Sequence, residues 1–159
     1  MPEAEQVVDV VVREVTIDAS PETIFPFFTD PEKMIRWKGI DAKLDPRPGG
    51  IYRVDVTGRD VARGEYVAVE TNTRVVFTWG WESPESPVQP GTSTVEITLR
   101  PEGSKTIVRL EHRDFPSAEA ATAHVDGWDH FLERLTIVAA GGDPGVDPWT
   151  LRSEEEGGK

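Results

Sequence analysis

Two of the chain's three histidines lie close together in the stretch AHVDGWDHFLERL, residues 123–135, beside two aspartates and a tryptophan. Imidazoles and carboxylates that share one helix face could hold a metal ion or exchange protons with a substrate. At about 100° per residue, however, His124 and His130 lie roughly 120° apart around a helix. His130 points to the polar side, where Asp126 pairs with it by spacing as an ordinary surface contact. We therefore expect no metal site here.

His124 falls on the apolar stripe of the same predicted helix, the stripe that faces the rest of the domain. His112 ends the inward-facing alternation of a predicted strand, so both imidazoles are candidates for an internal site. In a cavity they could bind a polar group of a ligand or act as acid and base. Each could equally be a core histidine bonded to backbone or to a polar neighbour. The sequence leaves both interpretations open.

Four of the five tryptophans also fall where side chains are expected to face inward, and such rings serve as core filler or as pocket walls. As a set they favour a lined pocket. The candidate ligand-binding residues are Trp37, Tyr52, Trp79, Trp81, His112, His124, Trp128 and Leu132. No residue is assigned as catalytic and no cofactor is expected, because the sequence lacks the common nucleophile, dinucleotide, phosphate-loop and zinc-helix motifs.

The apolar patterns that would position these residues predict an α+β domain. Ser20–Pro21 and Asp30–Pro31 each indicate the start of a short helix, and Pro26 shortens or kinks the first of them. Helical periodicity begins at Ser117 and ends near Gly141. One strand is predicted before the short helices, in residues 7–19, and five or six follow them. The strands assigned after the helices lie in residues 51–56, 63–70, 73–81 and both arms of a hairpin over 92–115.

A curved antiparallel sheet leaves one apolar face exposed, and the long C-terminal helix is the element large enough to cover it. The space between them is either filled core or a ligand cavity. We assign residues 8–140 to one domain, 1–7 to an N-terminal extension and 141–159 to a Gly/Pro-rich, acidic tail that is expected to be mobile at its acidic end. The acidic, proline-rich stretch 82–91 is expected to be a loop.

The charge of the chain narrows its partners. Its 29 acidic residues exceed its 17 Lys and Arg, giving a net charge of −12 without a basic patch, so nucleic acid and membrane surfaces are not expected partners. The absence of cysteine and of a signal-peptide pattern favours a cytoplasmic protein. Edge strands could pair two copies, so a monomer and a homodimer both stay open.

Five segments in order, VTIDASPETIFPFFTDPEKMIRWKG, DPRPGGIYRV, GEYVAVETNTRVVFTWGW, TIVRLEHRDFP and HVDGWDHFLERL, resemble the AHSA1 domain. This is the domain of the activator of Hsp90 ATPase homologues, within the START-like (SRPBCC, Bet v 1-like) superfamily. The resemblance covers about residues 8–140 and implies a helix-grip fold with a cavity between sheet and helix. It further implies binding of lipids, sterols, polyketides or other apolar molecules. The matching positions, which include Trp37, Trp79, His112 and Trp128, are mostly structural or pocket-lining in the family.

The leading hypothesis is therefore a small-molecule binding protein that holds an apolar or aromatic ligand between the sheet and the C-terminal helix. One alternative is a cyclase- or hydrolase-like enzyme on the same cavity, with His112 or His124 as acid and base. Another is an interaction protein of the Hsp90-type co-chaperone kind, for which an exposed apolar patch on the outer face of the sheet would be the sign.

Overall fold

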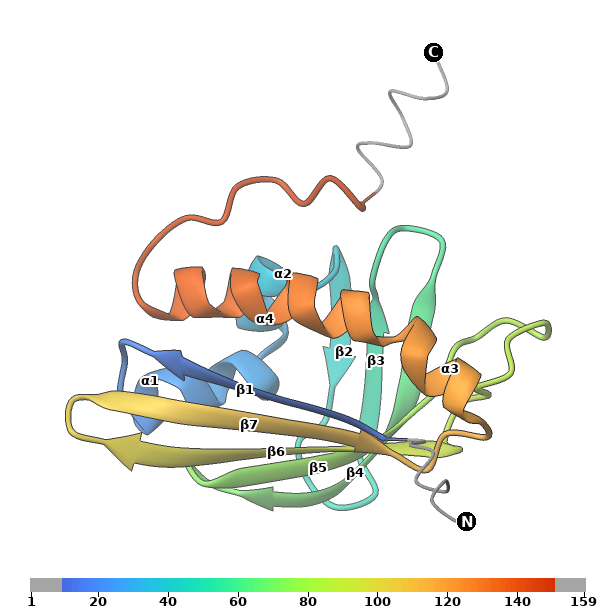
Figure 1. Ribbon diagram of the computed structural model, residues 1–159, viewed down its shortest axis with the longest axis horizontal. Coiled ribbons are helices and arrows are strands. Elements are labelled where there is room, and N and C mark those ends of the chain that lie inside the picture. Colours follow the sequence, from blue (N-terminus) through green and yellow to red (C-terminus); the bar gives the residue numbers. More distant parts are fainter. Residues whose placement is uncertain (1–9, 151–159) are drawn as a thin grey trace, which may run out of the picture.

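The strand patterns of the sequence form one sheet within residues 10–150, the part of the chain that the computed structural model describes. The strands are β1 (Val11–Ile17), β2 (Asp41–Leu44), β3 (Ile51–Asp55), β4 (Val61–Glu70), β5 (Arg74–Trp79), β6 (Ser93–Glu102) and β7 (Lys105–Arg113). All neighbouring strands pair antiparallel, in the order β1-β7-β6-β5-β4-β3-β2. The sheet curves beneath the C-terminal helix (Figure 1).

The helices are α1 (Pro21–Ile24), the 3-10 helix η2 (Phe25–Phe28), α2 (Pro31–Trp37), α3 (Ala118–Ala123) and α4 (Val125–Ala139). The first and third begin as predicted, since the Ser20 hydroxyl accepts the Thr23 N–H at 3.2 Å and the Asp30 carboxylate accepts the Glu32 N–H at 3.0 Å. Pro26 has no N–H to donate to an α-helical bond, and α1 gives way to η2 there.

Two elements differ from the sequence-based expectation. Strand β2 has no clear apolar alternation, yet it pairs with β3 at the edge of the sheet, with Leu44 opposite Tyr52. The helix expected to run on from Ser117 is interrupted at His124, which lies between α3 and α4 with φ −99° and ψ −3°. His124 nevertheless lines the cavity beneath this junction, on the inward side where the helical stripe places it.

The inward face of the sheet is set by the β6–β7 hairpin as predicted. Val95 lies opposite His112 and Ile97 lies opposite Leu110, and all four side chains are buried. The α4 side chains that pack onto this face are Trp128, Phe131, Leu132, Leu135 and Ala139. The predicted helix-grip fold is confirmed.

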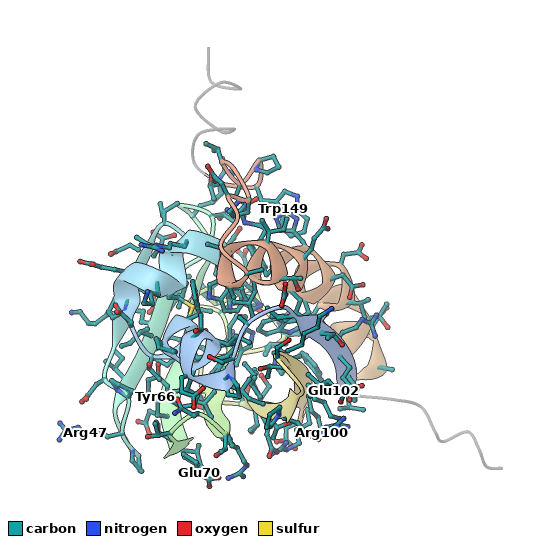
Figure 2. All side chains as sticks on the ribbon, turned by 90° about the vertical axis from the view of Figure 1, so that its left-hand side faces the viewer. Arg47, Tyr66, Glu70, Arg100, Glu102 and Trp149 are labelled. Carbon is teal, nitrogen blue, oxygen red and sulfur yellow. The ribbon has the colours of Figure 1, made fainter. Side chains whose placement is uncertain are left out.

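Residues 141–150 fold back over α4. Arg134 donates to the carbonyl oxygens of Pro144 at 3.3 Å and of Gly145 at 3.1 Å. His130 Nε2 lies 2.8 Å from Asp147 Oδ1, and the His130 ring stacks on Trp149 with 3.8 Å between the ring centroids. His130 therefore binds this segment, and the expectation that it forms a surface pair with Asp126 is wrong. Figure 2 shows Trp149 at the opposite end of the molecule from Glu70, Arg100 and Glu102. The extension 1–7 and the acidic end of the tail lie outside the described residues.

Candidate ligand-binding site

A cavity of about 530 Å³ lies where the β3–β4 turn, the 82–91 loop and the α3–α4 junction meet. Its aromatic wall consists of Trp79, Trp81, Trp128, Phe131 and Trp149. The 82–91 loop closes one side because Val88, which is fully buried, accepts the Trp81 backbone N–H at 2.8 Å. The space between sheet and helix is thus partly hollow at this end.

The structure brings four of the predicted site residues together on this wall: Trp79, Trp81, His124 and Trp128. The other four, Trp37, Tyr52, His112 and Leu132, are not on the cavity surface and are at most 2% exposed. Tyr52 stacks on Phe77 at 4.0 Å, and the Trp37 indole donates to the Phe27 carbonyl at 3.0 Å. Of these four, Tyr52 and His112 contact wall residues from behind, with ring centroids 6.1 and 5.6 Å from that of Trp79. The part of all eight residues in ligand binding stays a prediction.

His112 lies at the centre of a buried chain of hydrogen bonds. The Trp128 indole N–H donates to His112 Nδ1 at 3.0 Å, so the ring proton belongs on Nε2, which lies 2.8 Å from the Ser93 hydroxyl oxygen. Ser93 in turn donates to the Trp79 carbonyl at 2.8 Å. Burial lowers the pKa of His112 from 6.5 to about 2, with smaller contributions from the charges of His124 and Lys38. His112 is therefore a neutral, fully bonded core histidine.

His124 reaches the cavity wall but is also bonded through both nitrogens. Its Nδ1 lies 2.8 Å from the Ala120 carbonyl, which can only accept, and its Nε2 accepts the Trp81 indole N–H at 2.9 Å. Burial lowers the pKa of His124 most, the Ala120 bond opposes this, and Lys38 lowers it further. Neither His112 nor His124 has a free nitrogen with which to exchange a proton with a ligand.

Lys38 is a cavity residue that sequence reasoning missed. It follows α2 directly, in a stretch that reads as an exposed helix end, yet it is only 2% exposed. Its Nζ lies 3.2 Å from the Tyr52 hydroxyl and 4.0 and 4.5 Å from the ring centroids of Trp79 and Trp128. Burial lowers the pKa of Lys38 well below its ordinary value. Among residues 10–150 no carboxylate forms an ion pair with it.

Trp79 supplies a second unusual polar group. Its indole Nε1 is buried and has no hydrogen-bond partner within the described part of the chain. Buried donors are normally bonded, so each exception needs an explanation. The corresponding N–H groups of Trp81 and Trp128 are both bonded to imidazoles. Trp79 therefore differs from its neighbours on the wall in having an N–H to spare.

Fold and cavity together define a helix-grip protein with an aromatic-lined cavity. Residues 18–140 match the family described as Activator of Hsp90 ATPase homolog 1-like protein, and the chain belongs to this family. The resemblance drawn from the five sequence segments is confirmed. No curated protein sequence matches the chain.

Three solved structures place the family relationship in context. The solution structure of an AHSA1-like protein from Rhizobium etli is 48% identical over 88% of this chain and 87% of that chain, with a TM-score of 0.70. The Aha1 dimer from Colwellia psychrerythraea is 21% identical over 85% and 98%, with a TM-score of 0.72. An Hsp90 activator from Plasmodium falciparum is 20% identical over 82% and 96%, with a TM-score of 0.68. The last two show the shared fold alone.

Among residues 10–150, no helix has the length and apolar character needed to cross a bilayer. Within the same residues, no group of three or more His, Asp or Glu side chains is arranged to hold a metal ion.

Proposed function

We propose that the protein binds a small apolar or aromatic molecule in the cavity beneath the α3–α4 junction. The observation that carries the proposal is a cavity of about 530 Å³ with a wall of tryptophan and phenylalanine rings. Sites for small molecules commonly span about 300–1,000 Å³ and are lined mainly by apolar and aromatic side chains. A ring system of two or three fused or linked rings is the size of ligand that such a space accommodates.

The hydrogen bonds of the cavity wall favour a binding protein over an enzyme. Trp81 is fixed through His124, and Trp128 is fixed through His112 and Ser93, so these indoles present their faces in set orientations. A site that is ordered before the ligand arrives loses less conformational entropy on binding. The same bonds use the imidazole nitrogens that the cyclase- or hydrolase-like alternative needs for proton transfer.

The co-chaperone alternative expects an apolar outer face on the sheet. The outer face instead carries a network in which Glu96 accepts from Arg74 at 2.7 Å and from Arg113 at 2.8 Å. Arg113 also lies 3.3 Å from Glu111. This polar network does not favour docking through apolar contacts, and an Hsp90-type partner stays a prediction.

Filling the cavity from Gly127 is expected to weaken binding of the neutral fluorescent probe N-phenyl-1-naphthylamine. Gly127 lines the cavity from α4, and a Cβ placed there meets no atom within 4 Å. Gly127→Phe would place a ring in the space that the probe needs, and we expect its dissociation constant to rise at least about tenfold, or 1.4 kcal/mol. Probe fluorescence during titration of the purified protein measures this constant.

Gly127→Ala is the matched control. It leaves the cavity open and removes the helix penalty of glycine, so we expect unchanged probe affinity and a gain of up to about 1 kcal/mol in the free energy of unfolding. Failure of the wild-type protein to bind the probe, or equal affinities in wild type and Gly127→Phe, would contradict the proposed function.

A further inference from the structure

The spare hydrogen-bonding capacity at the inner end of the cavity consists of donors. When charged, Lys38 Nζ has three N–H groups, and the Tyr52 hydroxyl is the polar group within hydrogen-bond distance. Trp79 Nε1 adds a buried N–H that has no partner in the described residues. Lys38 Nζ lies 4.0 Å from the centroid of the Trp79 ring, so the amine lies against the ring that carries this N–H.

An amine in this position is costly unless something compensates for it. Removing a charged group from water without a counter-charge destabilises the folded protein, and no carboxylate of residues 10–150 pairs with Lys38. The ring faces of Trp79 and Trp128, 4.0 and 4.5 Å away, attract an ammonium group and offset part of that cost. If the cavity bound only wholly apolar ligands, the folded protein would be more stable with an apolar side chain in place of Lys38.

An oxyanion fits this region better than other polar groups do. It accepts hydrogen bonds from both donors, and its charge favours the protonated form of a nearby amine. A neutral carbonyl would accept the same bonds without supplying the charge, and a cation would be repelled. The inner end of the cavity therefore selects by charge as well as by shape.

The acidic residues of the cavity lie at its rim. Asp60 and Asp126 are exposed, and Glu82 is held by Arg53 at 2.8 Å and Arg63 at 3.1 Å. Water and arginine screen these charges, whereas Lys38 lies among aromatic rings where electrostatic interactions are stronger. In such an arrangement an anionic ligand would lie with its oxyanion inward and its apolar body towards the rim.

We propose that the natural ligand is an apolar or aromatic acid whose oxyanion is held by Lys38 Nζ and Trp79 Nε1. The proposal rests on the proposed function, because it assigns a ligand class to the same cavity. It adds a specificity-determining residue, Lys38, and a supporting donor, Trp79, to a site otherwise built of ring faces.

The test compares 1-naphthoate with 1-naphthamide, two molecules of the same shape that differ in charge, as competitors of N-phenyl-1-naphthylamine. On the wild-type protein we expect the carboxylate to displace the probe at least about tenfold more strongly than the amide does. In Lys38→Met, a substitution of similar length without charge, this preference is expected to disappear while the neutral probe still binds. Lys43→Met, which removes an exposed lysine of β2, should keep the preference.

A second variant keeps the test valid if Lys38→Met does not fold. Trp79→Phe removes the spare N–H and keeps a ring, and we expect it to reduce the preference for the carboxylate by several-fold. Equal displacement by the two competitors on wild type, or a preference that survives in Lys38→Met, would overturn the inference while leaving the proposed function intact. Absence of probe binding to wild type would overturn both.

Discussion

Replacing His112 by alanine is expected to lower the free energy of unfolding by about 3–4 kcal/mol, because the substitution removes a fully buried ring. The loss has two parts. The core keeps a void where the imidazole packed 4.1 Å from Phe115 and 5.6 Å from Trp79, measured between ring centroids. Trp128 Nε1 also loses its acceptor, and a buried donor left unpaired costs about 1–3 kcal/mol. Urea unfolding followed by tryptophan fluorescence measures the difference.

His112→Gln is the control for this experiment, since its amide retains both a donor and an acceptor. We expect it to cost clearly less than His112→Ala. If alanine cost under about 1 kcal/mol, a typical value for a substitution at an average site, His112 would not be a central packing residue.

Acidification from pH 7 to pH 5 is expected to lower the free energy of unfolding by about 2 kcal/mol through His112 alone. Its pKa is about 2 in the folded protein and 6.5 in the unfolded chain. Below pH 6.5 His112 is therefore protonated in the unfolded chain but stays neutral in the folded protein. The contribution is fully present above pH 6.5 and decreases by about 1.4 kcal/mol per unit as the pH falls towards 2. The lowered pKa of His124 acts in the same direction.

Urea unfolding at half-unit steps between pH 7 and pH 5 gives this slope. Glu82 and Glu96 interfere little in that range, because their arginine partners lower their pKa values below 4.5 and their contribution is lost only in stronger acid. In His112→Gln the change of unfolding free energy per pH unit should become smaller by the equivalent of nearly one proton, or about 1.4 kcal/mol. An unchanged slope in that variant would show that His112 does not control the acid response.

The architecture was predictable where the apolar pattern repeats. Alternation over β6 and β7 placed Val95, Ile97 and His112 on the inner face, and Ser20 and Asp30 marked the helix starts through their caps. Strand β2 was not predictable, since it is four residues long and its pairing depends on β3. The break at His124 depends on tertiary contacts that helical periodicity does not contain.

The site was predictable only in part, for a related reason. Trp79, Trp81 and Trp128 could be placed because they follow strand or helix periodicity. Lys38 follows the end of a helix and Trp149 lies in the C-terminal tail. In neither place does a periodic pattern specify which way a side chain points. A lysine is mostly exposed in folded proteins, so composition gave no reason to place Lys38 among four aromatic rings.

The most direct measurement is a titration of the ¹⁵N-labelled protein with N-phenyl-1-naphthylamine, followed through the five tryptophan indole N–H signals in two-dimensional NMR. Ligand binding in the cavity predicts saturable shifts of the Trp79, Trp81 and Trp128 signals, which come from its wall. The Trp37 signal, whose N–H donates to the Phe27 carbonyl in the core, should move least. Trp149 also lines the cavity but is half-exposed, so a shift of its signal alone does not distinguish the cavity from the surface. If the Trp79, Trp81 and Trp128 signals all stayed in place at saturating probe, the central claim would be wrong.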